Sequence, residues 1–310
     1  MQRIDANTQI FGIIGYPLSH TFSPAMHNAA FEAMGINAIY LVFPMKNLYQ
    51  LKHAMRQFHI KGLSVTIPHK ITVRRLLDTI DPLALQIGSV NTIVWNEKGL
   101  LEGHNTDGIG ALWAIRESGF SLEGKKVLVI GTGGSARAIC FTLSREKISQ
   151  LGILGRNRYK LVQLAKNLRL LKSAPPLELI EFPHGQKMKQ PLIKPWRWRR
   201  KTLHSPADTE PYDLIIQTTP LGMSGHEEAE KSPLLSSYLF PHQTVFDIVY
   251  NPHRTPFLEL ALKRKCQVIY GYKMLLHQGV RQFELFTGVS PDIKTMEKAL
   301  LKVMAKTHGK

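Results

Sequence analysis

One segment constrains the fold more than any other: residues 126–144 read KVLVIGTGGSARAICFTLS. A β-branched apolar run, typical of a buried strand, precedes Gly131, Gly133 and Gly134, and a stretch of small and apolar residues follows that predicts a helix. Glycines at such a junction allow a tight turn and let a pyrophosphate reach the backbone N–H groups that open the helix. The segment therefore predicts a dinucleotide-binding loop over residues 131–135, although an ordinary strand-to-helix turn has a similar pattern.

The rest of the chain repeats the alternation of strand and helix. Helical patterns lie between short β-branched runs, as in residues 24–35, which open on Pro24 and stop at Gly35. This alternation predicts an α/β protein with parallel sheets, and 310 residues suffice for two domains. The runs that predict strands are 10–14, 38–43, 62–67, 89–95, 126–131, 150–155, 213–218, 244–249 and 267–271.

The stretch from about 173 to 211 breaks this pattern. It contains seven prolines and no sustained hydrophobic period. We expect it to form an irregular surface insertion.

The net charge of +17 is concentrated in one part of the chain. Residues 156–201 hold 13 Lys and Arg against two acids, a net +11 (13 − 2), which leaves +6 (17 − 11) for all other residues. Such a cluster is typical of a nucleic-acid or membrane contact, or of an anionic cofactor site beside a solvated basic loop.

The residues after the run 150–155 separate these interpretations. An NAD site usually has an acid here for the ribose 2′-hydroxyl, whereas a 2′-phosphate requires cations. The chain reads Arg156, Asn157, Arg158, Tyr159 and Lys160, with no acid. Basic residues at the start of a helix oppose its dipole, which argues against a merely solvated helix end. NADP is therefore the predicted cofactor.

Three polar clusters interrupt the first third of the chain. In the first, Ser23 before Pro24 predicts a helix N-cap, and its hydroxyl also suits a substrate carboxylate. The second ends on Lys70 at the expected start of a helix, where the dipole gives a lysine no stabilisation. The third comprises Asn91 and the segment 104–108, in which Asp107 is expected to cap a helix.

Reduction of a ketone by a nicotinamide needs a group that protonates the forming alkoxide. A lysine oriented by a carboxylate can supply the proton, which makes Lys70 and Asp107 the candidates. Their spacing leaves open whether they meet or act separately in capping and at the surface.

Cysteine and hydropathy patterns bear on location. Cys140 and Cys266 lie far apart without metal-site spacing, so no metal is predicted and a reducing compartment is expected. No apolar run approaches the roughly 20 residues of a membrane span, and the N-terminal segment has no hydrophobic signal core. We expect a soluble, cytoplasmic protein.

Seven motifs, in order and spacing, resemble those of the shikimate dehydrogenase family, over about residues 10–290. They read GYPLSHTFSPAMHN, GLSVTIPHK, GSVNTIVW, GHNTDGIG, VLVIGTGGSARA, FDIVYNPHRTPFL and GYKMLLHQGVRQFELFTG. The resemblance implies a discontinuous α/β substrate domain (1–107 and 272–310) and a doubly wound Rossmann NADP domain (108–271), with a cleft between them. It also implies reversible NADPH-dependent reduction of 3-dehydroshikimate to shikimate, on the chorismate pathway to aromatic amino acids.

The resemblance assigns roles to individual residues. Lys70 corresponds to the proton-transfer residue and Asp107 to its partner. The implied substrate positions are Thr21, Ser23, Thr66, Asn91, Tyr250 and Gln278. The implied cofactor positions are Gly131, Thr132, Gly133, Gly134, Ser135, Asn157, Arg158, Lys160, Ile248, Gly271 and Met274.

Three departures from the family pattern keep alternatives open. Thr21 stands for a serine, Ser64 stands for an asparagine, and the Asn157 motif continues with Tyr159 and Lys160. These changes allow quinate or NAD use as one alternative. Another is nucleic-acid binding through the cations and tryptophans of residues 187–201. A monomer and a homodimer are both compatible with the sequence.

Overall fold

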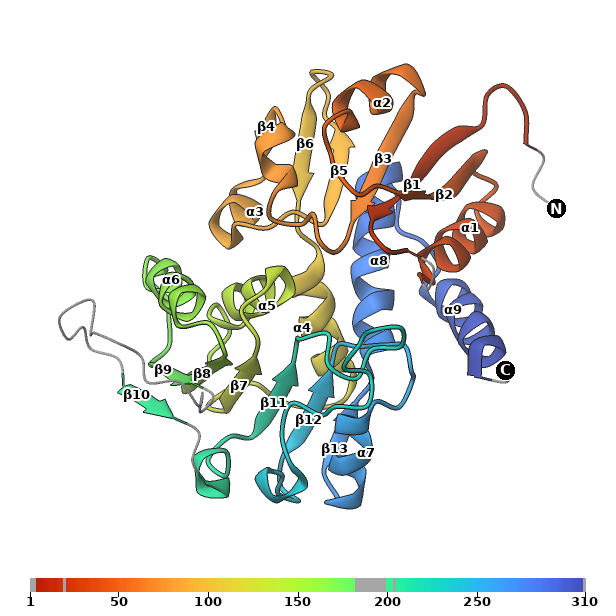
Figure 1. Cartoon of the computed structure of the whole chain (residues 1–310). Helices are drawn as coiled ribbons and strands as arrows, with labels where there is room; N and C mark the ends of the chain where they lie inside the picture. Colours follow the sequence, from red (N-terminus) through yellow and green to blue (C-terminus); the bar gives the residue numbers. More distant parts are fainter. Residues whose placement is uncertain (1–3, 19–20, 182–198, 203–204, 309–310) are drawn as a thin grey trace. The chain divides into compact units, whose positions relative to one another are not determined.

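The computed structural model describes residues 4–18, 21–181, 199–202 and 205–308 (Figure 1). Two compact units make up the chain: Met1–Ala111 with Tyr272–Lys310, and Leu112–Gly271. The boundaries fall within helix α4 (Asp107–Glu117) and at the first residue of helix α8 (Gly271–Thr287). Among the described residues, no helix combines the length and the apolar character that crossing a membrane requires.

The first unit is built on a six-stranded sheet with the order β2-β1-β3-β5-β6-β4. Its strands are β1 (Gln9–Gly15), β2 (Ala38–Pro44), β3 (Ile60–Val65), β4 (Thr79–Ile80), β5 (Thr92–Trp95) and β6 (Leu101–His104). β1 pairs in parallel with β2 and β3, but β5 runs antiparallel to both β3 and β6. The prediction of parallel sheets is therefore wrong for β5, because the short turn between β5 and β6 can join only antiparallel strands.

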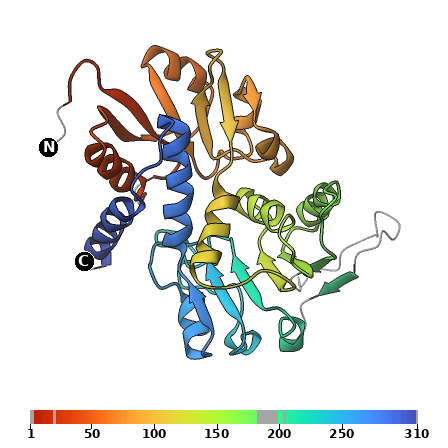
Figure 2. The ribbon, with the colours of Figure 1, turned by 180° about the vertical axis from the view of Figure 1, so that it is seen from behind.

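Helices cover both faces of this sheet. They are α1 (Ser23–Ala33), α2 (Leu51–Gln57), α3 (Pro82–Ile87), α8 and α9 (Ile293–His308), with a short 3₁₀ helix at Val73–Leu76. Alternate residues of β1 point to opposite faces of the sheet. On one face Phe11 packs against Phe31 of α1 and Phe286 of α8. On the other face Ile14 belongs to a hydrophobic cluster that includes Leu51 and other residues of α2 and α3. α9 lies beside α1 (Figures 1 and 2).

The second unit contains a seven-stranded sheet in which every pairing is parallel, in the order β10-β9-β8-β7-β11-β12-β13. Its strands are β7 (Lys126–Ile130), β8 (Gln150–Gly155), β9 (Leu177–Glu181), β10 (Arg199–Thr202), β11 (Leu214–Gln217), β12 (Thr244–Asp247) and β13 (Gln267–Ile269). Its helices include α5 (Gly134–Leu143), α6 (Arg158–Leu168) and α7 (Pro256–Lys263). Because the strand order reverses between β7 and β11, the sheet is doubly wound, and ligands bind at such a switch point.

The segment 173–211 is not wholly irregular, which corrects the sequence-based interpretation. β9 and β10 extend the sheet from its β8 edge. Leu179 and Ile180 are buried, and the Tyr212 hydroxyl donates to Glu178 at 2.5 Å. A five-residue strand preceded by two prolines is too short to give a hydrophobic period, so composition concealed it. Residues 182–198, with Trp196 and Trp198, lie outside the described residues.

Candidate active site

Lys70 and Asp107 meet in the first unit. Lys70 lies in the loop after β3, and Asp107 is the first residue of α4, directly after the segment that follows β6. The Lys70 Nζ atom lies 2.5 Å from Asp107 Oδ2, and the two side chains are 16% and 4% exposed. An ion pair so little exposed is weakly screened by solvent, so each charge strongly influences the other.

Asp107 has a different structural role from the expected helix cap. Its backbone N–H donates to Asn105 Oδ1 at 3.0 Å, while its carboxylate bonds the side chains of Lys70 and Asn91. Asn91 Nδ2 donates to Asp107 Oδ1 at 2.8 Å. Since the two carboxylate oxygens bond different donors, the carboxylate is fixed in position relative to Lys70.

Gln278 reaches the same cluster from α8. Its Oε1 atom lies 3.4 Å from Asn91 Nδ2 and 3.5 Å from Thr106 Oγ1, and the side chain is buried. A Cβ atom added at Gly110 would lie 2.7 Å from Gln278 Cβ. The absence of a side chain at Gly110 therefore allows α4 to approach this part of α8 closely.

Of the remaining sequence-predicted substrate residues of this unit, Thr21 and Ser23 lie at the start of α1 and Thr66 at the end of β3. Ser23 is buried and is the first residue of α1, so Phe22, in a helical conformation, takes the N-cap position that the Ser-Pro pattern assigned to Ser23. The Ser23 N–H donates to Thr21 Oγ1 at 3.4 Å. Thr66 follows β3, where its methyl group lies beside Gly15. Ser19 and His20 lie outside the described residues.

Sequence reasoning missed Gln282, which is buried one helical turn beyond Gln278. Its Oε1 accepts from Ser64 Oγ at 2.8 Å. Its Nε2 donates to Asn91 O at 3.0 Å and to Thr92 Oγ1 at 3.1 Å. The spacing of two glutamines at i and i+4 places both on one helix face and was the available signal.

The glycine-rich loop of the second unit joins β7 to α5. Gly131 has φ of +123°, and a Cβ atom there would lie 2.3 Å from Thr218 Oγ1, so both conformation and space require glycine. At Gly133 an added Cβ would meet nothing within 4 Å. Ser135 lies in the first turn of α5, and Thr132 lies beside Gly155. Open space over a helix N-terminus fits a pyrophosphate.

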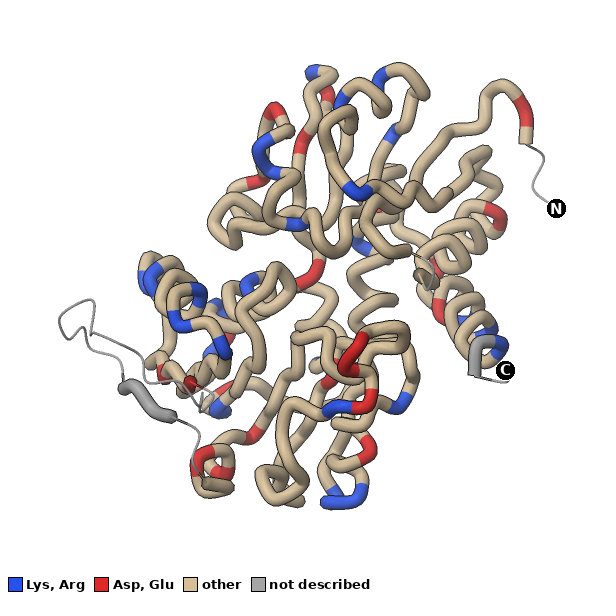
Figure 3. The backbone as a smooth tube through the Cα atoms, in the orientation of Figure 1, with Lys and Arg blue, Asp and Glu red and all other residues tan. Residues whose placement is uncertain are grey.

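The predicted 2′-phosphate residues open α6. Asn157 is the N-cap, and its Oδ1 accepts from the Lys160 N–H at 3.0 Å. Arg158 Nε lies 3.6 Å from Glu181 Oε1 at the end of β9, with both side chains about a quarter exposed. Sequence reasoning missed Glu181 because it lay in the segment interpreted as irregular. Lys and Arg gather along α6, as Figure 3 shows, so the helix presents positive charge to an anion.

Ile248 and Tyr250 follow β12 in the second unit. Asp247, at the end of β12, accepts from the Thr255 hydroxyl at 2.7 Å and from the Val249 N–H at 3.0 Å, which fixes this turn. Burial raises the pKa of Asp247 to about 7.

The two remaining cofactor candidates are on α8. A Cβ atom added at Gly271 would lie 2.3 Å from Val249 O, so the start of α8 can approach this turn only with glycine. Met274 is buried and belongs to the first unit.

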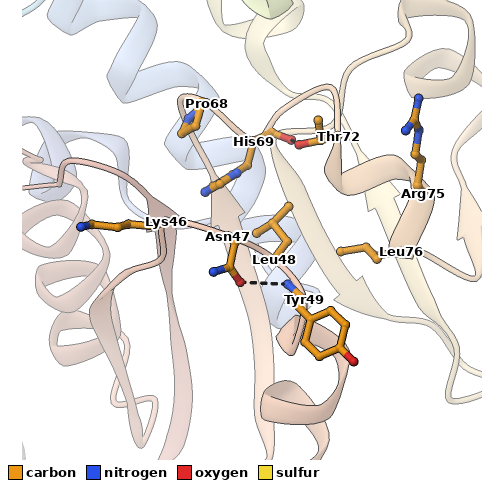
Figure 4. A pocket seen from close by; sticks show the side chains of 9 residues that line it. All are labelled: Lys46, Asn47, Leu48, Tyr49, Pro68, His69, Thr72, Arg75 and Leu76. Atoms are coloured by element: carbon orange, nitrogen blue, oxygen red, sulfur yellow. Dashed lines mark hydrogen bonds between the residues drawn. The ribbon is translucent and has the colours of Figure 1, made fainter.

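A hollow of about 440 Å³ lies beside the loop that carries Lys70 (Figure 4). Its lining consists of Lys46, Asn47, Leu48, Tyr49, Pro68, His69, Thr72, Arg75 and Leu76. In Figure 4 the side chains of Lys46 and Arg75 lie at opposite ends, with Leu48 between them. His69 Nε2 lies 2.7 Å from Met45 O, so this buried histidine ties the Lys70 loop to the segment after β2.

Comparisons with known proteins agree with these two sites. The family model of the shikimate dehydrogenase substrate binding domain matches residues 13–93, and that of the shikimate 5′-dehydrogenase C-terminal domain matches residues 271–301. The shikimate dehydrogenase (NADP(+)) of Methanobrevibacter smithii is 39% identical over 303 residues, covering 97% of this chain and 99% of the relative.

Solved structures give the same result. A crystal structure of a shikimate dehydrogenase in complex with NADP⁺ has a TM-score of 0.83 and 33% identity, covering 98% of both chains. The shikimate 5-dehydrogenase of Listeria monocytogenes, in complex with shikimate and NAD, has a TM-score of 0.80 and 27% identity, covering 97% of this chain and 99% of that one. The ordered motifs, the doubly wound sheet and the full-length identity lead to one conclusion: the chain belongs to the shikimate dehydrogenase family.

Proposed function

We propose that this protein is an NADP-dependent shikimate dehydrogenase, which reversibly reduces 3-dehydroshikimate to shikimate on the pathway to chorismate and the aromatic amino acids. The observation that carries the proposal is the Lys70–Asp107 ion pair, at 2.5 Å and little exposed, with Asn91 on the second carboxylate oxygen. The full-length identity to an enzyme named for this activity supports it.

The chain's own residues handle the proton of this reaction. When bound, NADPH would supply the hydride that adds to the carbonyl carbon of the substrate, and in the reverse direction NADP⁺ would accept it. Negative charge then develops on the carbonyl oxygen, and Lys70 Nζ donates a proton to it, which yields the hydroxyl group. Asp107 holds the ammonium group in place, and in the reverse direction Lys70 accepts the hydroxyl proton as hydride leaves the carbon. Protons and electrons balance, because ketone, hydride and proton together make the alcohol.

Polar side chains around this pair would bind the ring substituents. Thr66, Asn91 and Gln278 offer hydroxyl and amide groups for the substrate hydroxyls, two of them already adjacent to each other at 3.4 Å. Thr21 and Ser23, at the start of α1, would bind the carboxylate, assisted by Tyr250. A site built to hydrogen-bond several hydroxyls discriminates strongly against substrates that lack them.

The cofactor assignment rests on residues, because similar folds are crystallised with NADP⁺ and with NAD. Gly131, Thr132, Gly133, Gly134 and Ser135 would hold the pyrophosphate. Arg158, with Asn157 and Lys160, would hold the 2′-phosphate, since a guanidinium group matches phosphate geometry. Ile248, Gly271 and Met274 would lie at the nicotinamide end. We propose NADP on the ground that cations, and no acid, directly follow β8.

A four-way kinetic comparison tests the proposal. We expect kcat/KM to be highest for shikimate with NADP⁺ among the pairs formed by shikimate or quinate with NADP⁺ or NAD⁺. Lys70→Ala serves as the control for the assigned chemistry. Equal or better turnover of quinate, a preference for NAD⁺, or a Lys70→Ala variant with undiminished rates would each overturn the corresponding part of the proposal.

A further inference from the structure

The Gln282 side-chain amide forms three hydrogen bonds inside the first unit, and none of them is to Lys70 or Asp107. Its side chain is 2% exposed. The amide nitrogen bonds Asn91 O and Thr92 Oγ1, and the amide oxygen bonds Ser64 Oγ. A buried amide whose donors and acceptor are all used fixes the groups that it bonds, since any reorientation leaves one of them unpaired.

The donor and acceptor directions of these hydrogen bonds determine how the Asn91 amide faces Asp107. Thr92 Oγ1 accepts from Gln282, so its single proton is directed to Asn91 Oδ1, 2.8 Å away. The Thr106 N–H donates to the same Asn91 oxygen at 2.8 Å. With two donors on Oδ1, the Asn91 nitrogen must face Asp107, to which it donates at 2.8 Å.

We infer that Gln282 is a positioning residue for the proposed reaction: through Thr92 it holds the Asn91 amide in the orientation that fixes the Asp107 carboxylate beside Lys70. The inference rests on the proposed function, because it assigns a task to Gln282 only in proton transfer by Lys70. Gln282 acts on the reacting groups through Thr92 and Asn91, and its contribution is orientation.

The far end of the same network provides a matched control. The Tyr40 hydroxyl, on β2, donates to Ser64 Oγ at 2.6 Å, and Tyr40 is 1% exposed. Tyr40→Phe removes one buried hydrogen bond from the network and leaves Ser64 able to donate to Gln282. It therefore matches the loss of a buried bond without altering the donors to Asn91.

Two substitutions separate orientation from packing. Gln282→Glu keeps the size but replaces the donating NH₂ group with an oxygen, so Thr92 would donate to position 282 and no longer to Asn91. Gln282→Leu removes both the donor and the acceptor. Should either variant fail to fold, Thr92→Val interrupts the same chain of bonds at the next residue with almost no change in volume.

The first readout is steady-state kinetics of shikimate oxidation by NADP⁺. We expect kcat to fall by about tenfold in both Gln282 variants and in Thr92→Val, with the KM for NADP⁺ within about twofold of the parent value. Tyr40→Phe should retain the parent kcat even if its melting temperature falls. A parent-like kcat in the folded Gln282 variants would overturn the inference.

The second readout needs no turnover. The side-chain NH₂ resonances of Asn91, observed by ¹⁵N NMR in the full chain, report the hydrogen bond to Asp107. We expect them to move in both Gln282 variants and in Thr92→Val but not in Tyr40→Phe. Unchanged resonances would refute the positioning role even if kcat fell. A parent enzyme that is inactive on shikimate would refute the proposed function, and the NMR readout would still decide whether Gln282 orients Asn91.

Discussion

At the scale of single residues, the proposed chemistry depends on two charges that cannot be replaced by neutral groups of the same shape. Lys70 comes from the loop after β3 and Asp107 from the start of α4, yet their polar atoms lie 2.5 Å apart. Lys70 has to give up and regain a proton in each cycle, and the negative charge of Asp107 sets where the ammonium group lies while it does so. The charge of Asp107, more than its hydrogen-bonding geometry, should therefore carry its contribution.

Substituting Asp107→Asn tests this point. The amide keeps the size of the side chain but removes the charge, so we expect kcat for shikimate oxidation to fall by about 10²-fold or more. Circular dichroism should show the folded state retained. A Glu102→Gln variant, altered at a partly exposed acid of neighbouring β6, is the matched control and should keep parent activity.

His27 provides a second prediction, on stability. It is fully buried and stacks on Tyr40 with ring centroids 4.3 Å apart. Burial lowers its pKa to about 3, whereas in the unfolded chain it titrates near 6.5. Between these values the unfolded state binds a proton that the folded state does not, so stability falls as pH falls, by about 1.4 kcal/mol per pH unit.

Urea unfolding at several pH values measures this effect. The parent protein should lose stability between pH 6.5 and pH 4 more steeply than His27→Phe, which keeps an aromatic ring but cannot be protonated. His53→Phe, at a more solvent-accessible position of α2, is the control and should follow the parent. Parallel profiles of His27→Phe and the parent would contradict the assignment.

Individual residues were predictable from sequence where the local pattern was anomalous. Lys70 stood out because the sequence predicts it at a helix start, where a lysine opposes the dipole. That helix start is wrong, since Lys70 lies in the loop before the 3₁₀ helix Val73–Leu76, and its nearness to Asp107 required the fold. Asp107 and Ser23 show the opposite error: each fits a capping pattern, but each is the first residue of its helix. Phe22 takes the N-cap position of α1, and Asn105 Oδ1 accepts from the Asp107 N–H. For Gln282 the only signal was its i, i+4 spacing from Gln278, which is weak because polar pairs at this spacing are ordinary on helix surfaces.

At the scale of elements, the β8–α6 junction carries the choice of cofactor. Asn157 caps α6, and Arg158, next along the chain, lies beside Glu181 of β9. The Glu181 carboxylate lies beside the Nε atom of Arg158, and the other N–H donors of the guanidinium group suit a phosphate. The Asn157 cap and the end of β9 together therefore fix the position of Arg158 beside the carboxyl ends of β8 and β9.

Arg158→Gln should lower kcat/KM for NADP⁺ by about 10-fold or more while changing that for NAD⁺ little, because only NADP⁺ has the additional phosphate. The matched control is Arg169→Gln, which removes the same charge at the other end of α6. If both variants lost NADP⁺ turnover equally, general charge and not the position of Arg158 would set the preference.

Most elements of the second unit were predictable, since buried parallel strands are continuous apolar runs. Two strands that the sequence did not predict, β6 of the first unit and β9 of the second, share a cause. β6 contains Glu102, Gly103 and His104, and β9 reads Leu-Glu-Leu-Ile-Glu, so their strand character comes from pairing with β5 and β8 and not from propensity.

At the scale of the whole molecule, the net charge of +17, of which +11 lies in residues 156–201, attracts anionic ligands. Both shikimate and the nicotinamide cofactors are anionic, and a positive field raises their local concentration. NADP⁺ has more negative charge than NAD⁺ and should respond more strongly.

The KM for NADP⁺ should therefore rise with ionic strength between about 0.01 and 0.3 M, and more steeply than the KM for NAD⁺. Varying NaCl at constant pH in the shikimate oxidation assay measures both slopes. Salt effects on the protein itself would change both KM values alike, so the difference between the slopes isolates the 2′-phosphate. Equal slopes would mean that the net charge does not act on it.

The first unit is assembled from both ends of the chain, which has a consequence for synthesis. Phe31 packs against Phe283, and Phe11 against Phe286, yet α8 and α9 are translated only after the whole second unit. While the ribosome is still making the second unit, the aromatic face of the first has no partner and is open to chaperones or to aggregation. The second unit is continuous and can fold first, so completion of the first must wait until α8 and α9, which follow it in the chain, have been made.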